Sequence, residues 1–172
     1  MTEEYPIFLL PQGEIMMTAK IVDGGIVLLK ETLFPSGQRY AISHDGLTAC
    51  LDTSKKLILY GQLKENGEFE FVKILPFPSM ISPKSICIVH QNLVLGGEND
   101  HNFDNDINSH ELVVSYSIKD DTFIPVEMPF KAYDKCIDDL LLVGDIVIAV
   151  DNVIYPKYVL EYDFKNPNSP IL

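Results

Sequence analysis

The residues with the clearest chemical potential lie in one acidic, asparagine-rich segment, residues 100–111. Their oxygen-bearing side chains alternate along the segment, and a carboxylate closes it, as in a twelve-residue calcium loop. The ligand positions would be held by Asp100, Asn102, Asp104, Asp106, Asn108 and Glu111. Asn105 stands where such loops prefer glycine, and it tolerates the left-handed backbone at some cost. The spacing predicts a weak Ca²⁺ site, and the alternative is an acidic loop with accidental spacing.

A second group of acids recurs along the chain, each directly after an apolar run and before a small polar residue. The pairs are Asp52–Thr53, Glu98–Asn99 and Asp151–Asn152. If the runs are equivalent strands, the pairs lie on one face and form a polar binding surface, where neighbouring carboxylates could serve acid–base chemistry. The alternative is that each acid accepts hydrogen bonds from the backbone of its own turn.

Other catalytic constellations are not indicated. No nucleophile elbow, phosphate loop or dinucleotide fingerprint occurs. His44 and Asp45 adjoin each other, but Asp45-Gly46 is explained by turn geometry alone. The three cysteines, Cys50, Cys87 and Cys136, are far apart and form no CxxC pair, which favours reduced thiols in a cytoplasm.

Composition excludes several functional classes. The chain has 172 residues, 47% of them hydrophobic, which excludes disorder as the dominant state. Its 13 Lys and Arg against 25 Asp and Glu give a net charge of −12, which argues against nucleic-acid backbones and anionic membranes as partners. No apolar run approaches the length of a membrane span, and the acidic start lacks the basic region of a signal peptide. We therefore expect a single cytoplasmic domain over residues 1–172.

The elements that must position these residues are predicted to be β-strands almost throughout. Short runs rich in Val, Ile, Leu, Tyr and Phe alternate with turn residues such as Asp45-Gly46 and Asn66-Gly67. The runs span residues 15–22, 26–33, 39–43, 47–51, 56–63, 68–75, 85–90, 93–95, 112–119, 122–128, 140–143, 146–150 and 158–164. Such a series of hairpins is typical of a sandwich, a barrel or a propeller.

Internal repeats favour the propeller. Phe34, Phe77 and Phe130 recur in similar contexts at spacings of 43 and 53 residues, and a second strand, an acid and a third strand follow each of them in register. Four strands in a repeat of this length are the pattern of a propeller blade. The recurring phenylalanines are then expected to pack between blades.

The second repeat resembles a kelch motif. Its strand ends in the double glycine Gly96-Gly97, and Tyr116 precedes an aromatic residue, Phe123, at kelch-like spacing. The other repeats depart from this pattern, and the chain contains no Trp. The resemblance implies a propeller-like fold, and the repeats together predict an all-β chain of about four four-stranded antiparallel blades.

The repeat boundaries leave the ring incomplete. They span residues 14–37 in part, 39–80, 85–131, and 138–172 in part. Closed propellers have about 4 to 8 blades. Three arrangements fit this count: a small ring closed by the chain itself, part of a larger propeller, or a pair of chains that cover each other's open edges.

The expected function is that of a non-enzymatic interaction module, which binds a protein partner through loops on one face. Propellers display loops rigidly, although a fold does not determine a function. The alternative is a small-ligand-binding protein or a hydrolase-type enzyme, with Asp52, Glu98 and Asp151 around a cleft. The two functions predict different geometries. In an enzyme or ligand-binding protein the three acids converge, whereas in an interaction module each acid bonds its own turn.

Overall fold

The structure is a computed structural model that describes residues 6–9, 15–22, 25–33, 39–43, 45–99, 113–126, 136–144, 146–150 and 159–163. Within these residues the chain forms antiparallel β-sheets joined by turns, and no helix occurs. Across the same residues, no helix is long and apolar enough to cross a membrane. The predicted all-β fold class is confirmed.

The described strands form four separate sheets. The first has the order β1 (Pro6–Leu9), β2 (Ile15–Val22), β3 (Gly25–Leu33). The second has the order β4 (Arg39–Ile42), β5 (Leu47–Asp52), β6 (Leu57–Leu63), β7 (Phe69–Pro76). The third has the order β8 (Ile81–Val89), β9 (Asn92–Asn99), β10 (Val113–Ser117), β11 (Thr122–Val126). The fourth has the order β12 (Asp139–Val143), β13 (Ile146–Val150), β14 (Val159–Asp163).

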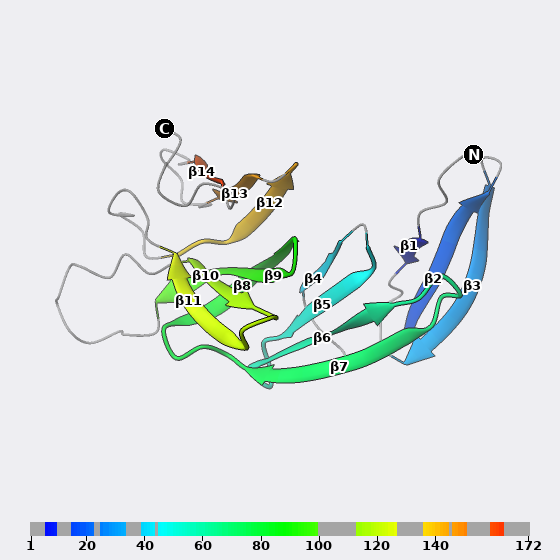
Figure 1. The fold of residues 1–172 in the computed structure, drawn as a ribbon, viewed down its shortest axis with the longest axis horizontal. Coiled ribbons are helices and arrows are strands. Elements are labelled where there is room, and N and C mark those ends of the chain that lie inside the picture. The colour runs from blue at the N-terminus through cyan, green and yellow to red at the C-terminus, as the bar shows by residue number, and fades with distance from the viewer. Residues whose placement is uncertain are drawn as a thin grey trace, which may run out of the picture.

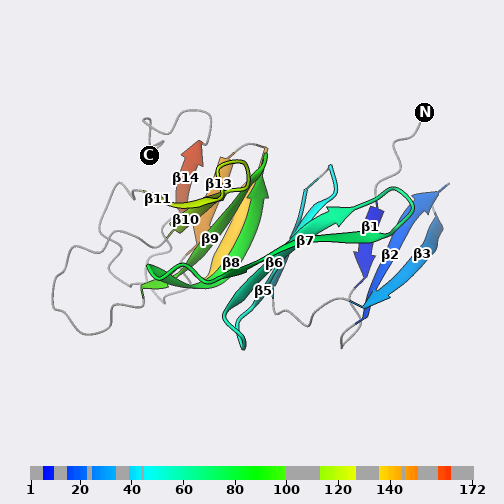
Figure 2. The same ribbon diagram turned by 60° about the horizontal axis from the view of Figure 1, so that its bottom comes forward.

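The four sheets follow one another in an open arc, with the first and fourth sheets at its two ends (Figures 1 and 2). On one side of the arc the leading strands converge, since β4 contacts β8 and β8 contacts β12. Each sheet is a meander of neighbouring strands, which is the arrangement of propeller blades. Within the described residues the first and fourth sheets share no strand pairing, so these residues form an open, partial propeller.

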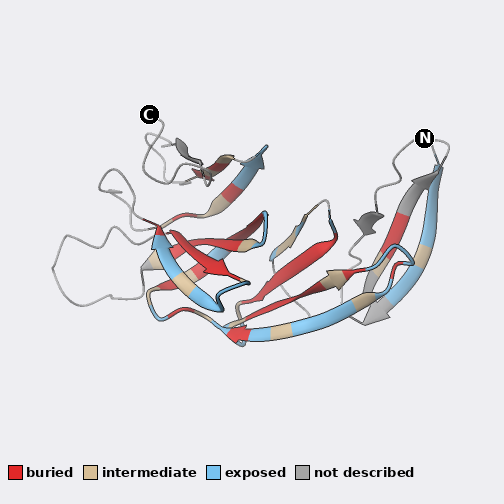
Figure 3. Cartoon of the chain, in the orientation of Figure 1, coloured by how far each residue is buried: buried red, intermediate tan, exposed pale blue. Residues whose placement is uncertain are grey.

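The core lies between the sheets rather than at one centre. Strands β5, β6, β8, β9 and β10 are mostly buried, whereas β3, β7 and β11 are exposed along much of their length (Figure 3). The second and third sheets meet through one apolar cluster, which includes Leu51, Ile58, Leu93 and Val114. Partly buried Phe77 packs against this cluster, as its recurrence predicts.

A second cluster joins the third sheet to the fourth. It includes Cys87 and Val94 from the third sheet and Leu140, Val147 and Ala149 from the fourth. The third sheet therefore buries apolar side chains on both faces, and burial of such area is the main stabilising term of the stack.

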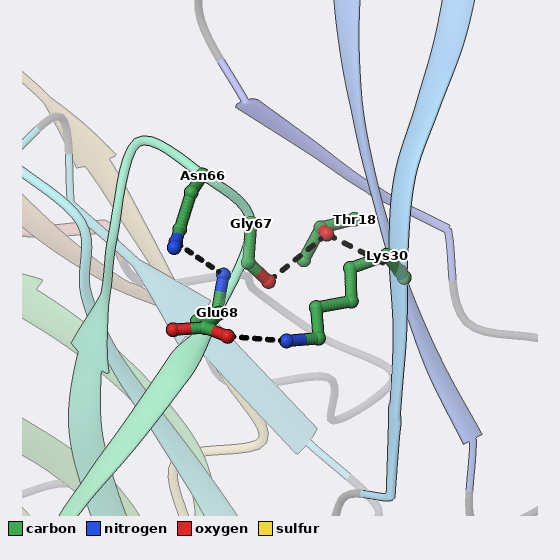
Figure 4. A network of polar contacts seen from close by, with 5 residues as sticks. All are labelled: Thr18, Lys30, Asn66, Gly67 and Glu68. Carbon is green, nitrogen blue, oxygen red and sulfur yellow. Dashed lines mark hydrogen bonds and ion pairs between the residues drawn. The ribbon is translucent and has the colours of Figure 1, made fainter.

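Polar contacts attach the first sheet to the second (Figure 4). Thr18 Oγ1 donates to the Gly67 carbonyl at 3.1 Å, and Lys30 Nζ forms an ion pair with Glu68 Oε1 at 2.5 Å. Asn66 Oδ1 accepts a hydrogen bond from the Glu68 N–H at 3.0 Å and so shapes the β6–β7 turn. Gly67 has φ +82°, the left-handed backbone that Asn-Gly turns require.

One strand begins earlier than the sequence predicts. The pattern predicts a strand from Ser85, but β8 starts at Ile81 and contains Pro83. The register against β9 shifts between Pro83 and Ser85. A bulge of this kind accommodates a proline, which cannot donate to the sheet ladder.

Candidate functional site

The candidate site is the end of the sheets where β5 and β9 finish, hereafter the Asp52 end. Asp52 and Glu98 lie there, one on each of the two central sheets. The opposite end carries the turns at Gly46, Gly67 and Gly144, which all have positive φ. The Asp52 end is also where residues 100–112 leave β9 and return to β10.

Asp52 is held by its own turn. Its side chain is only 3% exposed. Its carboxylate accepts hydrogen bonds from Ser54 Oγ at 2.6 Å and from the Lys55 N–H at 3.0 Å, and it forms an ion pair with Lys55 Nζ at 3.1 Å. These contacts, led by the hydrogen bond from Ser54, lower the pKa of Asp52. The carboxylate therefore stabilises its own turn, as predicted by the interpretation in which each repeated acid accepts hydrogen bonds from its turn.

Glu98 occupies the equivalent position but has a different environment. Its side chain is 47% exposed, and Oε2 forms an ion pair with Lys84 Nζ at 3.0 Å. Lys84 also approaches Asp138 Oδ1 at 3.8 Å. Glu98 pairs as an isolated β-bridge with Cys136, so it stands where the third sheet meets the chain leading to β12.

The group of Lys84, Glu98, Cys136 and Asp138 was not predicted from the sequence. Cys136 Sγ donates to Asp138 Oδ1 at 3.2 Å. Burial raises the pKa of Cys136 to about 11, outweighing the opposing effect of Lys84, so the thiol stays protonated. Hydrogen bonds with Cys136 and Glu98 raise the pKa of Lys84, which stays charged. The group is an ion-paired contact without an activated nucleophile.

The other thiols are inert for the same physical reason. Burial raises the pKa of both Cys50 and Cys87 to about 12. A protonated thiol is neither a nucleophile nor a metal ligand. Among the residues that the structure describes, no group of three or more His, Cys, Asp or Glu side chains is arranged to hold a metal ion.

The remaining predicted site residues are only partly placed. Thr53 is half-buried in the turn after Asp52, and the backbone of Asn99 pairs with Ile81. Asp52 and Glu98 take separate partners rather than sharing one. The following predicted residues lie outside the described part of the chain: Asp100, Asn102, Asp104, Asp106, Asn108, Glu111, Asp151 and Asn152.

The depressed pKa of Asp52 predicts a pH-dependent contribution to stability. Because the folded-state pKa lies below the ordinary 3.8, the contribution is present above about pH 4 and is lost as the pH falls through the folded value. We expect Asp52→Asn to lower the free energy of unfolding by about 1–2 kcal/mol at pH 7, and by progressively less below pH 4. Urea denaturation over a pH series measures this difference.

The matched control is Glu65→Gln in the exposed β6–β7 turn. It should change the free energy of unfolding by no more than about 0.5 kcal/mol at any pH. A penalty for Asp52→Asn that stayed constant down to pH 2.5 would contradict the ionised, turn-bonded carboxylate.

Comparison with solved structures identifies the fold. The chain superposes on U3-55K with a TM-score of 0.60 and 12% sequence identity, covering 95% of this chain and 47% of that one. It also superposes on a proposed 6-phosphogluconolactonase from Bacteroides fragilis with a TM-score of 0.57 and 12% identity, covering 97% of this chain and 49% of that one. Both are β-propeller proteins, and the chain has the fold of a partial propeller that spans about half their length. No protein-family model and no curated protein matches the sequence.

Proposed function

We propose that the chain is a non-enzymatic interaction module that binds a protein partner through the loops of its Asp52 end. The observation that carries this proposal is the contrast between its two repeated acids. Asp52 is buried and saturated by its turn, whereas the Glu98 carboxylate is 47% exposed beside Lys84. A half-exposed charge on a rigid sheet end is suited to recognition, because charged side chains at an interface rim steer and orient a partner.

The lengths of the loops also favour the Asp52 end as the binding face. The connection between Glu98 and the next apolar run has 13 intervening residues, against 4 after Asp52 and 6 after Asp151. Long loops on a rigid scaffold are where binding residues concentrate. Since this insertion is acidic and the chain carries a net charge of −12, the partner surface is expected to be basic.

No specific observation favours the enzymatic alternative. That alternative needs neighbouring carboxylates free to exchange protons. Asp52 is engaged by Ser54 and Lys55, and Glu98 by Lys84. The propellers that this chain resembles share its fold at 12% identity, which carries no activity over to it.

The kelch-like character of the second repeat is part of the proposal. Gly96 and Tyr116 pack in the contacts between neighbouring sheets, and Gly97 allows the close approach of β8 to β9 within the third sheet. A kelch-like blade would present the loop between its second and third strands, here residues 100–112, at the binding face.

The test compares two half-exposed carboxylates, each paired with a lysine. Glu98 lies at the Asp52 end, and Glu70 lies near the opposite end, 62% exposed and 2.9 Å from Lys64 Nζ. Quantitative affinity capture from a lysate, followed by binding measurements with each purified partner, should show weaker binding for Glu98→Gln. The expected loss is about fivefold, growing at low salt, with no loss for Glu70→Gln. Equal binding by both variants, or capture of no partner, would reject the proposed face.

The insertion is also expected to bind Ca²⁺ weakly. The side-chain ligands would be Asp100, Asn102, Asp104 and Glu111, with Asp106 giving its carbonyl and Asn108 acting directly or through water. Titration calorimetry should give a dissociation constant on the order of 10⁻⁴ to 10⁻³ M, and Asp104→Ala should abolish the heat. Absence of both heat and thermal shift at about 10 mM Ca²⁺ would rule the site out.

A further inference from the structure

The outer face of the fourth sheet has an exposed apolar centre with acidic positions around it. Register places Asp139 opposite Val150, Glu161 opposite Ile148 and Asp163 opposite Ile146. Register places Leu141 opposite Ile148 and Val143 opposite Ile146. These residues point away from Leu140, Val147 and Ala149, which pack on the third sheet. Leu141 is 51% exposed and Val143 59% exposed, and Ile146, Ile148 and Val150 on the same face are half-buried.

The apolar residues of β12 and β13 on this face are of the kinds that are buried inside the stack, whereas the β14 positions opposite Ile146 and Ile148 are acidic. Val94 and Val113 of the third sheet are buried against the fourth sheet. Leu93 and Val114, also of the third sheet, are buried against the second. An exposed continuation of such a face marks an interaction site, because soluble proteins rarely leave contiguous apolar patches bare. Its geometry suits one kind of occupant, namely the face of another β-sheet stacked in the same manner.

The first sheet offers a second apolar face at the other end of the arc. Thr18 faces the second sheet, where it bonds Gly67. Ala19, the next residue, faces the opposite way and pairs with Leu28. Leu28 and Ile26 therefore lie on the outer face, where they are 60% and 61% exposed. The outer faces of the first and fourth sheets thus both carry exposed apolar side chains, with Ala19 buried on that of the first.

We propose that the outer face of the fourth sheet binds the outer face of the first sheet of a second copy of this chain. The reciprocal contact forms at the other ends, so two copies close head to tail into one ring. A head-to-tail contact closes in this way when two copies are related by a twofold rotation.

The length of the matched structures supports a second copy as the occupant. One chain spans 47% of U3-55K and 49% of the Bacteroides fragilis protein, so two chains supply the length of one such propeller. Each copy contributes four sheets. Two copies then remain within the range of about 4 to 8 blades in closed propellers.

Sedimentation equilibrium at near-physiological salt tests the proposal on the unmodified chain. The expected species has twice the 19.4 kDa chain mass, and dissociates on dilution. Because each copy carries a charge of −12, added salt should strengthen the association by screening the repulsion between copies. A 19.4 kDa monomer at every concentration would overturn the proposal, and would leave further blades of a longer chain as the occupant.

Charge exchange across the contact tests its head-to-tail geometry. Leu141→Lys and Leu28→Glu each place an unpaired charge in the interface and should weaken dimerisation at least tenfold. An equimolar mixture of the two variants should regain the dimer, because the new lysine then faces the new glutamate. The matched control is Val72→Glu, 56% exposed on the outer strand β7, which should dimerise like the parent.

Circular dichroism and urea midpoints verify that each variant is folded. Dimerisation of Leu141→Lys at parental strength would overturn the assignment of the fourth sheet. Failure of the mixture to regain the dimer would overturn the head-to-tail contact, since a symmetric contact between two fourth sheets is not repaired by Leu28→Glu.

Discussion

Gly97→Ala is expected to lower the free energy of unfolding by about 3 kcal/mol. Gly97 stands opposite Pro83 at the bulge between β8 and β9. A Cβ at this position would lie 2.8 Å from the Pro83 Cα, and closer still to the Ser82 carbonyl oxygen. Both obstacles are backbone atoms, so relief requires the strands to separate. The Gly97 carbonyl also accepts the Ile137 N–H at 2.8 Å, which ties the third sheet to the chain before β12.

The matched control is Gly144→Ala. No atom lies within 4 Å of the Cβ added there, and only the positive φ of 63° opposes the substitution. That change should cost about 1 kcal/mol, the penalty of a left-handed residue with a side chain. Urea denaturation of both variants separates the cost of a steric clash from the cost of a left-handed backbone. A loss of stability in Gly97→Ala no larger than that in Gly144→Ala would contradict the close approach at Gly97.

Tyr116→Ala is expected to lower the free energy of unfolding by about 3–5 kcal/mol, the range for large buried aromatic side chains. Tyr116 is 1% exposed in the cluster between the second and third sheets. Its ring centroid lies 4.9 Å from that of Phe123 and 6.1 Å from that of Tyr60. Removing the ring leaves a cavity between two blades, and in a stacked fold the loss weakens both neighbours.

Tyr116→Phe separates the hydroxyl from the ring. The hydroxyl donates to Asp121, whose carboxylate also accepts Lys73 Nζ from β7 at 2.5 and 2.6 Å. Burial, with the Asp121 contact, raises the pKa of Tyr116 above its ordinary value, so it remains a donor at physiological pH. Because Asp121 is 61% exposed and keeps Lys73, the phenylalanine variant should lose only about 1 kcal/mol. Equal losses for the alanine and phenylalanine variants would show that the inter-sheet packing contributes nothing.

Local chemistry was enough to predict most of the strands and turns. The runs from Leu47, Leu57 and Ile146 are strands because β-branched and aromatic residues suit a pleated, buried surface. Asp45-Gly46 and Asn66-Gly67 are turns because their glycines adopt φ +85° and +82°. Strand β8 was predicted too short because Pro83 normally ends a strand, and only the pairing with β9 supplies the bulge that retains it.

The two repeated acids show where local reasoning stops. The partners of Asp52 are Ser54 and Lys55, two and three residues away, so the hydrogen-bonded turn could be predicted from the sequence. Glu98 has the same place in its repeat, but its partners reach it only through the β8–β9 pairing and the chain that leads to β12.

The sequence by itself determined the all-β class, the repeat of strands and the acidic turn after β5, because each depends on residues close along the chain. The tertiary structure decided that the described sheets form an open arc, that Lys84 pairs with Glu98, and that both glycines of the pair are required by close approaches. A Cβ on Gly96 would lie 2.7 Å from both Ile137 Cγ2 and Ser85 Oγ. Only a glycine at this position therefore lets the segment that leads to the fourth sheet pack so closely. Such approaches between distant segments have no local signature, since they depend on how closely two sheets pack rather than on the preferences of either strand.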